Sequence, residues 1–346
     1  MRILVIGGTR FIGPPVVNRL YEAGHSLRLF HRQPADIEFP PEVEHIYGDR
    51  RADWDAIAPE LVAFQPDVVL DMVPITEADA TRVVETFRGV AQRLVSISSQ
   101  DVYRAYGRIN GTEPGDPDPV PLAEDAPLRE QLYPYRGETP RPPDHANRIL
   151  DDYDKILVER VVMNEPDLPA TVLRLPMVYG PRDYQHRLYQ YLKRMDDGRP
   201  AILLDTLTAR WRWTRDFVDN TAAAIALSVT DKRAAGRVYN VGEEHPLTMV
   251  EWIDAIGQAA GWIGDIVTAA DYQLPDHLRA QAGLEQHLVA DTTRIRAELD
   301  FMPHITLDEA LRRTVIWERA HPPEQVDPAL FDYATEDYVL STLGRG

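Results

Sequence analysis

Three glycines stand near the start of the chain, in a segment whose backbone could bind phosphate. The run Ile3-Leu4-Val5-Ile6-Gly7-Gly8-Thr9-Arg10-Phe11-Ile12-Gly13 is typical of a buried strand, a tight turn and the start of a helix. Gly7 lets the turn close, Gly13 lets the helix lie close to the sheet, and the helix N-terminus offers N–H groups to a pyrophosphate. We therefore predict a dinucleotide site formed by Gly7, Thr9, Arg10, Phe11, Ile12 and Gly13.

Such a turn needs a parallel sheet to hold it, and the first half of the chain predicts one. Short hydrophobic runs alternate there with helical periodicity, which favours right-handed crossovers and a sheet covered on both faces. We predict strands over 2–6, 26–30, 43–47, 68–71 and 93–98, and helices over 11–23 and 77–89. The expected fold class is α/β, a Rossmann doubly wound parallel sheet with a smaller mixed α/β domain on its C-terminal side.

The alternation stops at a proline-rich segment, which has nine prolines between residues 114 and 143 and predicts a long loop. Further on we predict a strand over 171–175 and helices over 147–164, 188–195, 219–229, 248–260, 292–299 and 307–319. Thr248 and Glu251 have the spacing of a capping box, and Asp219 fits an N-cap. We assign a dinucleotide-binding domain to 1–175 with 211–242 returning to it, a substrate domain to 176–210 and 243–335, and an aperiodic tail to 336–346.

Composition excludes several kinds of site and partner. The 346 residues include no cysteine, which excludes disulfides, thiolate-bound metals and a cysteine nucleophile. The ten histidines show no paired ligand spacing, so no metal site is predicted. The formal net charge of −18 argues against a general nucleic-acid binder. We see neither a transmembrane segment nor a signal peptide and expect a cytoplasmic protein.

Four further motifs follow the glycine turn in order: Val95-Ser96-Ile97-Ser98-Ser99-Gln100-Asp101-Val102-Tyr103, Lys155-Ile156-Leu157-Val158-Glu159, Leu173-Arg174-Leu175-Pro176-Met177-Val178-Tyr179-Gly180-Pro181 and Val238-Tyr239-Asn240-Val241-Gly242. Together, over nearly the whole chain, they resemble the NAD-dependent epimerase/dehydratase group of the extended (atypical) short-chain dehydrogenase/reductase superfamily. Arg10 stands where that family has its middle glycine. The resemblance implies an epimerase, dehydratase or reductase that transfers hydride at a carbinol carbon of a nucleotide sugar or related polyol.

The same resemblance leaves a second function open. The glycine turn is also similar to that of a stem-loop-binding branch of the superfamily, so the alternative is a non-catalytic member that binds a dinucleotide or RNA. A homodimer is possible by analogy with the family.

The resemblance implies a catalytic serine, tyrosine and lysine, of which Ser99 and Lys155 match their positions. The tyrosine expected four residues before Lys155 is replaced by Asp151, and the nearest phenol, Tyr153, lies two residues before it. A spacing of two puts side chains about 200° apart on a regular helix. Three alternatives stay open: Tyr153 acts from an irregular helix start, Asp151 acts as a carboxylate base, or the cofactor is structural.

Other groups could join the reaction. Tyr133 and Tyr135, in the proline-rich segment, could move into the site. Asp101 lies two residues before Tyr103, where dehydratases of the family carry an acid that removes a proton, although it also fits a cap at the strand end.

The end of the second strand indicates the cofactor. NAD enzymes place a carboxylate there, whereas this chain has Phe30-His31-Arg32. Arg32 and Arg10 could both bind a 2′-phosphate, because guanidinium groups match phosphate bidentately, so we favour NADP over NAD. The resemblance places Asp49 at the adenine, and we expect further cofactor contacts from His31, Arg50, Lys155 and Pro176.

Substrate residues are expected later in the chain. In the stretch 210–219, counting back from Asp219 places Arg212 where the family has an arginine for the substrate diphosphate. Arg182 and Arg215 add positive charge nearby, which in so acidic a chain indicates an anionic ligand. Met177 stands where nucleotide-sugar enzymes often have asparagine. We predict that Met177, Arg182 and Arg212 bind a small anionic substrate, with a nucleotide sugar favoured.

Overall fold

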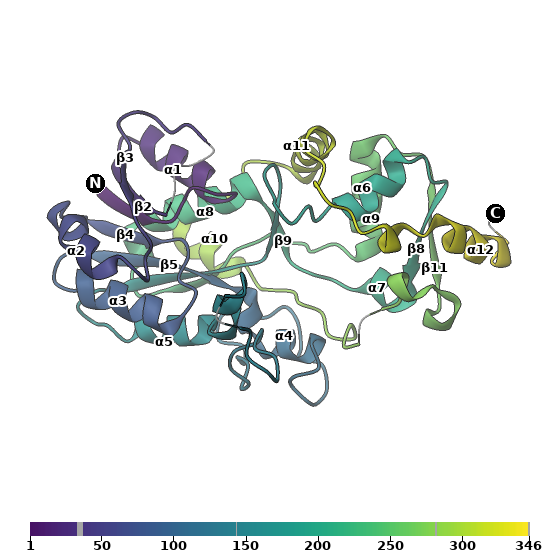
Figure 1. Cartoon of the computed structure of the whole chain (residues 1–346), viewed down its shortest axis with the longest axis horizontal. Helices are drawn as coiled ribbons and strands as arrows, with labels where there is room; N and C mark the ends of the chain where they lie inside the picture. The colour runs from purple at the N-terminus through teal and green to yellow at the C-terminus, as the bar shows by residue number, and fades with distance from the viewer. Residues whose placement is uncertain (33–36, 143, 281, 345–346) are drawn as a thin grey trace.

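The computed structural model describes residues 1–32, 37–142, 144–280 and 282–344, which form two halves along the long axis of the molecule (Figure 1). In these residues, the N-terminal half contains a seven-stranded parallel sheet in the order β10-β6-β5-β4-β1-β2-β3. Its strands are β1 (Arg2–Ile6), β2 (Ser26–His31), β3 (Glu44–Tyr47), β4 (Val68–Asp71), β5 (Arg93–Ser99), β6 (Ala170–Leu175) and β10 (Val238–Asn240). This order confirms the predicted Rossmann fold class.

Helices cover both faces of this sheet, because successive strand residues point to opposite sides. In β1, Ile3 and Val5 pack on one face, while Leu4 and Ile6 pack on the other. The first face is covered by α1 (Gly13–Glu22) and α8 (Val218–Thr230), the second by α2 (Trp54–Ala63), α3 (Glu77–Phe87) and α5 (Lys155–Met163). With both faces buried, the carboxyl ends of the strands are left to carry a site.

The C-terminal half is a smaller mixed α/β layer. It contains α6 (Tyr189–Asp196), β8 (Ala201–Asp205), α7 (Thr206–Arg210), α9 (Met249–Ala260), β11 (Asp265–Ala269), α11 (Leu307–Ala320) and α12 (Tyr333–Thr342). β8 pairs in parallel with β11, and β7 (Met177–Tyr179) forms a second short parallel pair with β9 (Arg215–Phe217). β9 lies between the two halves (Figure 1).

After β9 the chain returns to the large sheet through α8 and β10. α10 (Thr293–Leu299), which falls inside the predicted substrate domain, also lies against this sheet, where Tyr239 Oη of β10 donates to Glu298 at 2.9 Å. The domain boundaries stay a prediction.

Two predicted helices differ at their starts. α1 begins at Gly13, because Phe11 has a φ of +43° and belongs to the turn. The helix predicted over 147–164 is confirmed in its second half and wrong in its first: a 3-10 turn, η2 (Arg148–Asp151), is followed by a break, and α5 begins only at Lys155. Asp154 causes this break by capping α5, with its carboxylate accepting from the amide of Ile156 at 2.8 Å.

Other local predictions had mixed outcomes. The capping box of Thr248 and Glu251 is confirmed, whereas Asp219 lies in the first turn of α8 rather than at its N-cap. The predicted tail contains most of α12, whose Val339 and Leu340 are buried, and residues 345 and 346 of that tail lie outside the described residues. Hydrophobic burial thus orders a segment that shows little helical periodicity.

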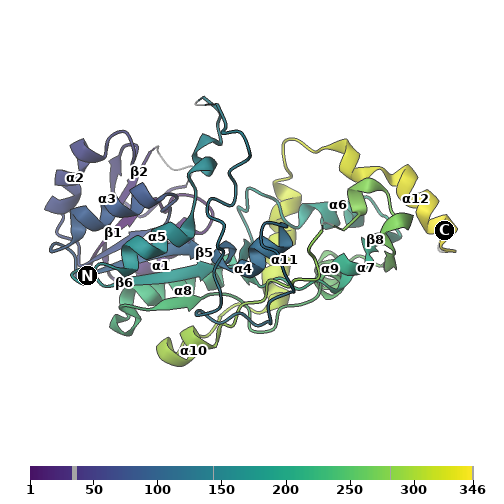
Figure 2. The same ribbon diagram turned by 90° about the horizontal axis from the view of Figure 1, so that it is seen from below.

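The proline-rich segment is a long connection beside α4 (Arg104–Ile109), and its position 143 lies outside the described residues (Figure 2). The amide of Leu122 donates to the carbonyl of Val289 at 2.7 Å, and Leu128 forms a bridge with Tyr103. In the part of the chain that the structure describes, no helix combines the length and hydropathy needed to cross a bilayer.

Candidate active site

The glycine turn has the tight geometry that its sequence predicts. Gly7 and Gly8 have φ values of +88° and +82°, a left-handed conformation that costs other residues free energy. A Cβ added to Gly13 would lie 2.3 Å from backbone atoms of Gly8, so α1 starts directly against the turn. The close approach explains why glycine is needed at position 13.

The amides of this turn are available to a ligand. Within the described residues, the N–H groups of residues 8 to 12 donate to no backbone or side-chain acceptor. We expected the N–H groups of the helix N-terminus to bind the pyrophosphate. Pro14 and Pro15 remove two of these groups from the first turn of α1, so most of the available donors belong to the loop before the helix. A concave row of unpaired amides fits the pyrophosphate of a dinucleotide.

Basic and polar groups surround the predicted ribose and adenine positions. Arg10 and Arg32 are exposed, and neither forms an ion pair with any other described residue. The Asp49 carboxylate accepts from the amides of Arg51 at 2.7 Å and Ala52 at 3.2 Å, and these bonds and the charge of Arg32 lower the pKa of Asp49. His31 packs beside β3, and its cofactor contact, like those of Arg10, Arg32 and Asp49, stays a prediction.

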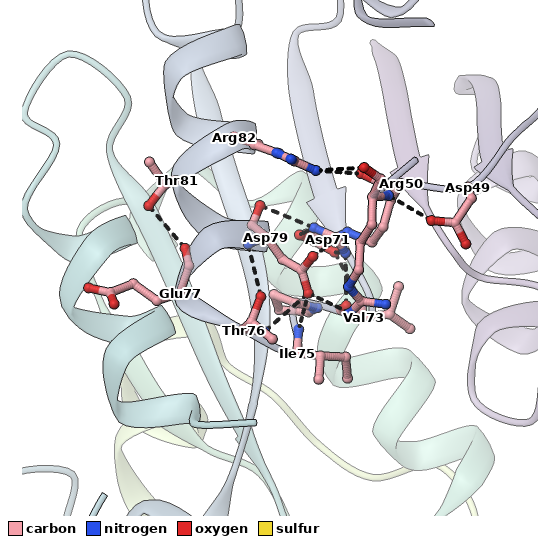
Figure 3. A network of polar contacts seen from close by, with 12 residues as sticks. Asp49, Arg50, Asp71, Val73, Ile75, Thr76, Glu77, Asp79, Thr81 and Arg82 are labelled. Carbon is pink, nitrogen blue, oxygen red and sulfur yellow. Dashed lines mark hydrogen bonds and ion pairs between the residues drawn. The ribbon is translucent and has the colours of Figure 1, made fainter. Parts of the chain in front are cut away.

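Arg50 is held in a buried ion-pair network instead of facing open solvent (Figure 3). Its guanidinium donates to both oxygens of Asp71, at 2.9 and 2.8 Å, and to the carbonyl of Val73 at 2.8 Å. Arg50 Nε also lies 3.5 Å from Asp79, which accepts a bond from Arg51 at 2.8 Å. These contacts occupy the Arg50 side chain that we had assigned to the cofactor, and they fix the loop between β4 and α3.

Lys155 is buried at the start of α5 and contacts this same loop. Its Nζ donates to the carbonyls of Pro74 at 2.6 Å and Ile97 at 2.9 Å. Burial lowers the pKa of Lys155 to about 8, although the charges of Asp101 and Asp71 raise it. An ammonium has three donors, so within the described residues one N–H of Lys155 remains for a ligand at the strand ends.

Tyr153 precedes α5 and is not on it, so the angle expected for a regular helix does not apply. Lys155 Nζ lies 5.7 Å from the centroid of the Tyr153 ring. The break at Asp154 therefore brings the two side chains to one side despite their spacing of two. This geometry supports the alternative in which Tyr153 acts from an irregular helix start.

The Tyr153 phenol meets a buried carboxylate. Its Oη donates to Asp101 Oδ2 at 2.7 Å, and Tyr135 Oη donates to the same oxygen at 3.1 Å. The Ser99 hydroxyl accepts from the amide of Asp101 at 3.2 Å, and its presence lowers the pKa of the Tyr153 phenol, against the stronger effect of burial. Arg129 Nε donates to the Asp101 backbone carbonyl. Four predicted catalytic residues thus lie together: Ser99, Asp101, Tyr153 and Lys155.

Burial and the charge of Asp101 dominate the electrostatics of this cluster. Burial raises the pKa of Asp101, and hydrogen bonding from Tyr153 and the charges of Arg129 and Lys155 oppose that rise only in part. Burial, and then the Asp101 charge, raise the pKa of Tyr153 well above its ordinary value. The phenol's direct partner is a carboxylate and not the lysine. Tyr153 is therefore a protonated donor at neutral pH.

Asp151 and Tyr133 lie in other contacts. The Asp151 carboxylate forms ion pairs with Arg141 and, at 3.6 Å, with Arg148. The Tyr133 ring stacks 3.7 Å from the Arg136 guanidinium, and within the described residues its hydroxyl makes no bond to the cluster. A carboxylate held by two guanidinium groups is a poor base, so the geometry favours Tyr153 over Asp151.

A buried ion pair connects two of the family motifs. Arg174 of β6 donates to both oxygens of Glu159 on α5, at 3.0 and 2.7 Å, and Ser98 of β5 donates to the same carboxylate. Tyr103 accepts from Arg174 at 3.0 Å and donates to Asn240 at 2.6 Å. These contacts hold α5, and hence Lys155, against the sheet.

A cavity of about 560 Å³ opens between the two halves. Tyr106 and Asn110, from α4 and the residue after it, line one side, and Met177 at the start of β7 lines it too. Aromatic and aliphatic side chains form much of the rest, among them Tyr191, Trp211, Trp213, Trp252, Ile202 and Leu288. The predicted residue Met177 is thus at a cavity large enough for a small molecule.

Strand alternation decides which arginine faces this cavity. Trp211, Trp213 and Arg215 line it, whereas Arg212, between them, is exposed. Arg182 is exposed as well and does not line the cavity. Arg215 therefore lines this cavity, whereas Arg212 and Arg182 do not, and the substrate contacts predicted for Met177, Arg182 and Arg212 stay predictions.

Arg215 differs from the other arginines of the cavity. Three of those form ion pairs: Arg187 with Asp183, Arg194 with Glu336 and Arg279 with Asp276. Arg215 is fully buried and stacks 4.6 Å from the Trp252 ring, and within the described residues it has no carboxylate ion pair and its Nε has no hydrogen-bond partner. The nearby charge of Glu243 opposes the effect of burial on the pKa of Arg215, but it forms no direct ion pair with the guanidinium among the described residues. A buried guanidinium without a direct ion pair favours an anionic ligand.

Two residues of the site escaped the sequence predictions. Tyr106 carries only a weak signal, its position three residues after Tyr103 on one helix face. Arg129 lies among prolines, where no periodicity indicates which side chains turn inward. Pro176, between β6 and β7, stays a predicted cofactor contact.

Comparisons with known proteins agree with this geometry. The sequence model of the NAD dependent epimerase/dehydratase family matches residues 148–242. A dTDP-glucose 4,6-dehydratase of Streptomyces griseus is 28% identical over 239 residues, which cover 68% of this chain and 61% of that protein. A chloroplast stem-loop binding protein of 41 kDa from Arabidopsis thaliana is 22% identical over 361 residues, covering 98% of this chain and 84% of that protein.

Solved structures share the fold. Thermus thermophilus UDP-glucose 4-epimerase, solved as a complex with NAD, superposes with a TM-score of 0.65 over 93% of this chain and 100% of that one, at 20% identity. The fold, the ordered motifs and the matched family model agree. The chain is thus similar to the NAD dependent epimerase/dehydratase family over residues 148–242 and to a dTDP-glucose 4,6-dehydratase over 68% of its length, and it shares the fold of a UDP-glucose 4-epimerase.

Proposed function

We propose that the protein is an NAD(P)-dependent oxidoreductase of the epimerase/dehydratase type, which acts at a carbinol carbon of a nucleotide sugar or related polyol. The observation that carries this proposal is the convergence of Ser99, Tyr153 and Lys155 at the carboxyl ends of β4 and β5. Ligands of open parallel sheets bind at this edge, where the strand order reverses.

The residues present fit a dinucleotide cofactor. The unpaired amides of residues 8 to 12 would hold the pyrophosphate, and the remaining N–H of Lys155 would hold ribose hydroxyls. The nicotinamide supplies the hydride chemistry when bound. Tyr153 exchanges a proton with the substrate hydroxyl, and Ser99 orients that hydroxyl.

The cavity supports an anionic, aromatic-bearing substrate. Among the described residues, Arg215 supplies a buried positive charge that has no direct ion pair, and the neighbouring rings of Trp211 and Trp213, with centroids 5.3 Å apart, offer surfaces for a base or a sugar. A diphosphate-linked sugar combines both features. The dehydratase and epimerase named above act on such compounds, which supports this substrate class.

Arg10 and Arg32 support NADP as the preferred cofactor. Both side chains are exposed near the predicted ribose, and neither has a carboxylate partner among the described residues. A 2′-phosphate would give both guanidinium groups a bidentate partner.

A titration of the purified protein with NAD and NADP, followed by calorimetry, tests the cofactor. The loaded protein is then mixed with UDP-glucose, UDP-glucuronic acid and dTDP-glucose while nicotinamide absorbance and product sugars are followed. We expect binding and turnover of at least one compound, and Tyr153→Phe should lower kcat by about 10²- to 10⁴-fold. Binding of neither cofactor would contradict the proposal.

RNA binding is the second candidate, favoured by the similarity to a stem-loop binding protein over 98% of the chain. The net charge of −18 opposes it, because phosphate backbones bind basic surfaces. Salt-dependent binding of a stem-loop RNA, without cofactor-dependent turnover, is the result that would favour this alternative.

A further inference from the structure

A chain of hydroxyl groups leads from the predicted catalytic phenol to the cavity wall. Tyr153 Oη and Tyr135 Oη both donate to Asp101 Oδ2, at 2.7 and 3.1 Å, and Tyr135 Oη lies 3.1 Å from Tyr106 Oη. The four side chains come from separate places: the break before α5, the turn η1 (Gln100–Val102) after β5, the proline-rich segment and α4. Tyr106 and the adjacent Asn110 line the cavity.

The carboxylate at the centre of this chain is costly to bury. Asp101 is 5% exposed, and among the described residues its second oxygen, Oδ1, has no hydrogen-bond partner. Buried carboxylates are normally paired with a cation, but Arg129 donates to the Asp101 backbone carbonyl and lies 3.5 Å from Asp154. Lys155 donates to two backbone carbonyls. Phenol hydroxyls are therefore the direct side-chain partners of Asp101.

Hydrophobic packing alone does not explain three phenol groups in one row. The rings of Tyr135 and Tyr153 meet edge to face with centroids 5.0 Å apart, a contact that phenylalanine would make equally well. What phenylalanine could not supply is the row of hydroxyl groups. Each of these hydroxyls can donate and accept a proton, as a relay requires.

We propose that Asp101 accepts the phenol proton that Tyr153 gives up as it takes a proton from the substrate, and that Tyr135 and Tyr106 carry a proton from Asp101 to the cavity. The proposal rests on the proposed oxidoreductase function and names the acid–base route of the same site. Asp101 and Tyr135 act through Tyr153 and are positioning and relay residues.

The steps balance in protons and electrons. Oxidation of the substrate alcohol would transfer its C–H hydride to a bound nicotinamide, which is the chemistry that the cofactor would supply. The O–H proton of the alcohol passes to Tyr153 Oη as the phenol's own proton moves to Asp101 Oδ2. The Tyr135 hydroxyl then turns toward Tyr106, accepts the Asp101 proton and releases its own to Tyr106, which releases one to water in the cavity. Reduction of a carbonyl runs the same steps in reverse.

The groups that face Asp101 set the sign of the expected titration. They are Tyr153, Tyr135, Ser99, Arg129 and Lys155, with Tyr106 one hydroxyl further away. The bond from Tyr135 stabilises the carboxylate and so lowers the pKa of Asp101. Tyr135→Phe removes that donor and should raise the titration midpoint of Asp101 by about one pH unit or more.

The first test needs neither cofactor nor substrate. The full chain with ¹³C-labelled aspartate carboxyls is titrated by NMR, and Asp101→Asn identifies the resonance. Tyr133→Phe is the matched control, because Tyr133 lies two residues away in the same segment and stacks on Arg136. We expect a raised midpoint in Tyr135→Phe and an unchanged one in Tyr133→Phe. An unchanged midpoint in Tyr135→Phe overturns the proposal.

The second test uses the cofactor and whichever sugar nucleotide turns over. Tyr135→Phe and Tyr106→Phe should lower kcat and leave KM unchanged. The loss of kcat should be smaller than the loss of about 10²- to 10⁴-fold expected for Tyr153→Phe. Both variants should also increase the solvent deuterium isotope effect and displace the pH profile of kcat. A change in KM alone would assign the tyrosines to packing and overturn the relay. If no sugar nucleotide turns over, the proposed function fails, and the NMR titration still decides the coupling of Tyr135 to Asp101.

Discussion

Removal of the Arg50 guanidinium should destabilise the fold far more than its position near the predicted cofactor suggests. In Arg50→Met, Asp71, which is 2% exposed, loses two charge-assisted bonds, and the carbonyl of Val73 loses a third. Breaking a buried ion pair on one side costs about 3–5 kcal/mol, because the remaining charge stays buried without a partner. This loss is a large part of the free energy of unfolding of a typical domain, which is about 5–15 kcal/mol.

Urea unfolding of three variants measures this effect. Arg51→Met is the matched control, because Arg51 is 37% exposed and its partner Asp79 keeps bonds from the amides of Ile75 and Thr76. We expect it to lose about 1 kcal/mol or less. Adding Asp71→Leu to Arg50→Met should recover much of the loss, since both partners are then gone. Equal small losses in both single variants, or lost NADP binding with stability intact, would refute this assignment of Arg50.

Three further variants test other parts of the account. Arg32→Asp should weaken NADP binding far more than NAD binding in calorimetric titrations, and equal weakening of both would contradict the 2′-phosphate contact. Gly13→Ala should lower the free energy of unfolding in urea by about 1–3 kcal/mol and abolish cofactor binding, because the added Cβ would lie 2.3 Å from Gly8. Gly137→Ala is the control, because its added Cβ would have its nearest contact at 3.6 Å. Equal behaviour of the two variants would be evidence against the tight turn. The pKa of Lys155 is about 8 in the folded protein and 10.5 ordinarily. Between these two pH values the unfolded chain binds one proton more than the folded chain, so the free energy of unfolding of the wild type should rise with pH. The rise should be roughly 2–3 kcal/mol relative to Lys155→Met. A constant difference between these two proteins from pH 7 to 10 would show that the lysine is not buried.

Local sequence patterns predicted the sheet and its edge well, because they depend on short-range rules. The alternation of strands and helices predicts a parallel sheet covered on both faces, and the glycines at 7 and 13 predict the tight turn, which the structure shows with a φ of +88° at Gly7 and a 2.3 Å approach at Gly13. Ser99 and Lys155 follow from motifs at the ends of β5 and the start of α5.

The composition of the site depends on contacts that sequence spacing does not show. The argument against Tyr153 assumed one helix over 147–164, and the cap formed by Asp154 breaks that helix and brings Tyr153 beside Lys155. Counting back from Asp219 selected Arg212, whereas the alternation of side chains in an extended strand places Arg215 at the cavity. Tyr135 reaches Asp101 through a proline-rich segment whose path depends on long-range contacts.

A crystal structure grown with saturating NADP tests the central claim most directly. The account predicts the pyrophosphate on the amides of residues 8 to 12, the nicotinamide ribose at Lys155 Nζ, and the nicotinamide ring beside Tyr153. A dinucleotide bound elsewhere, or an empty glycine turn at saturating concentration, would contradict the account.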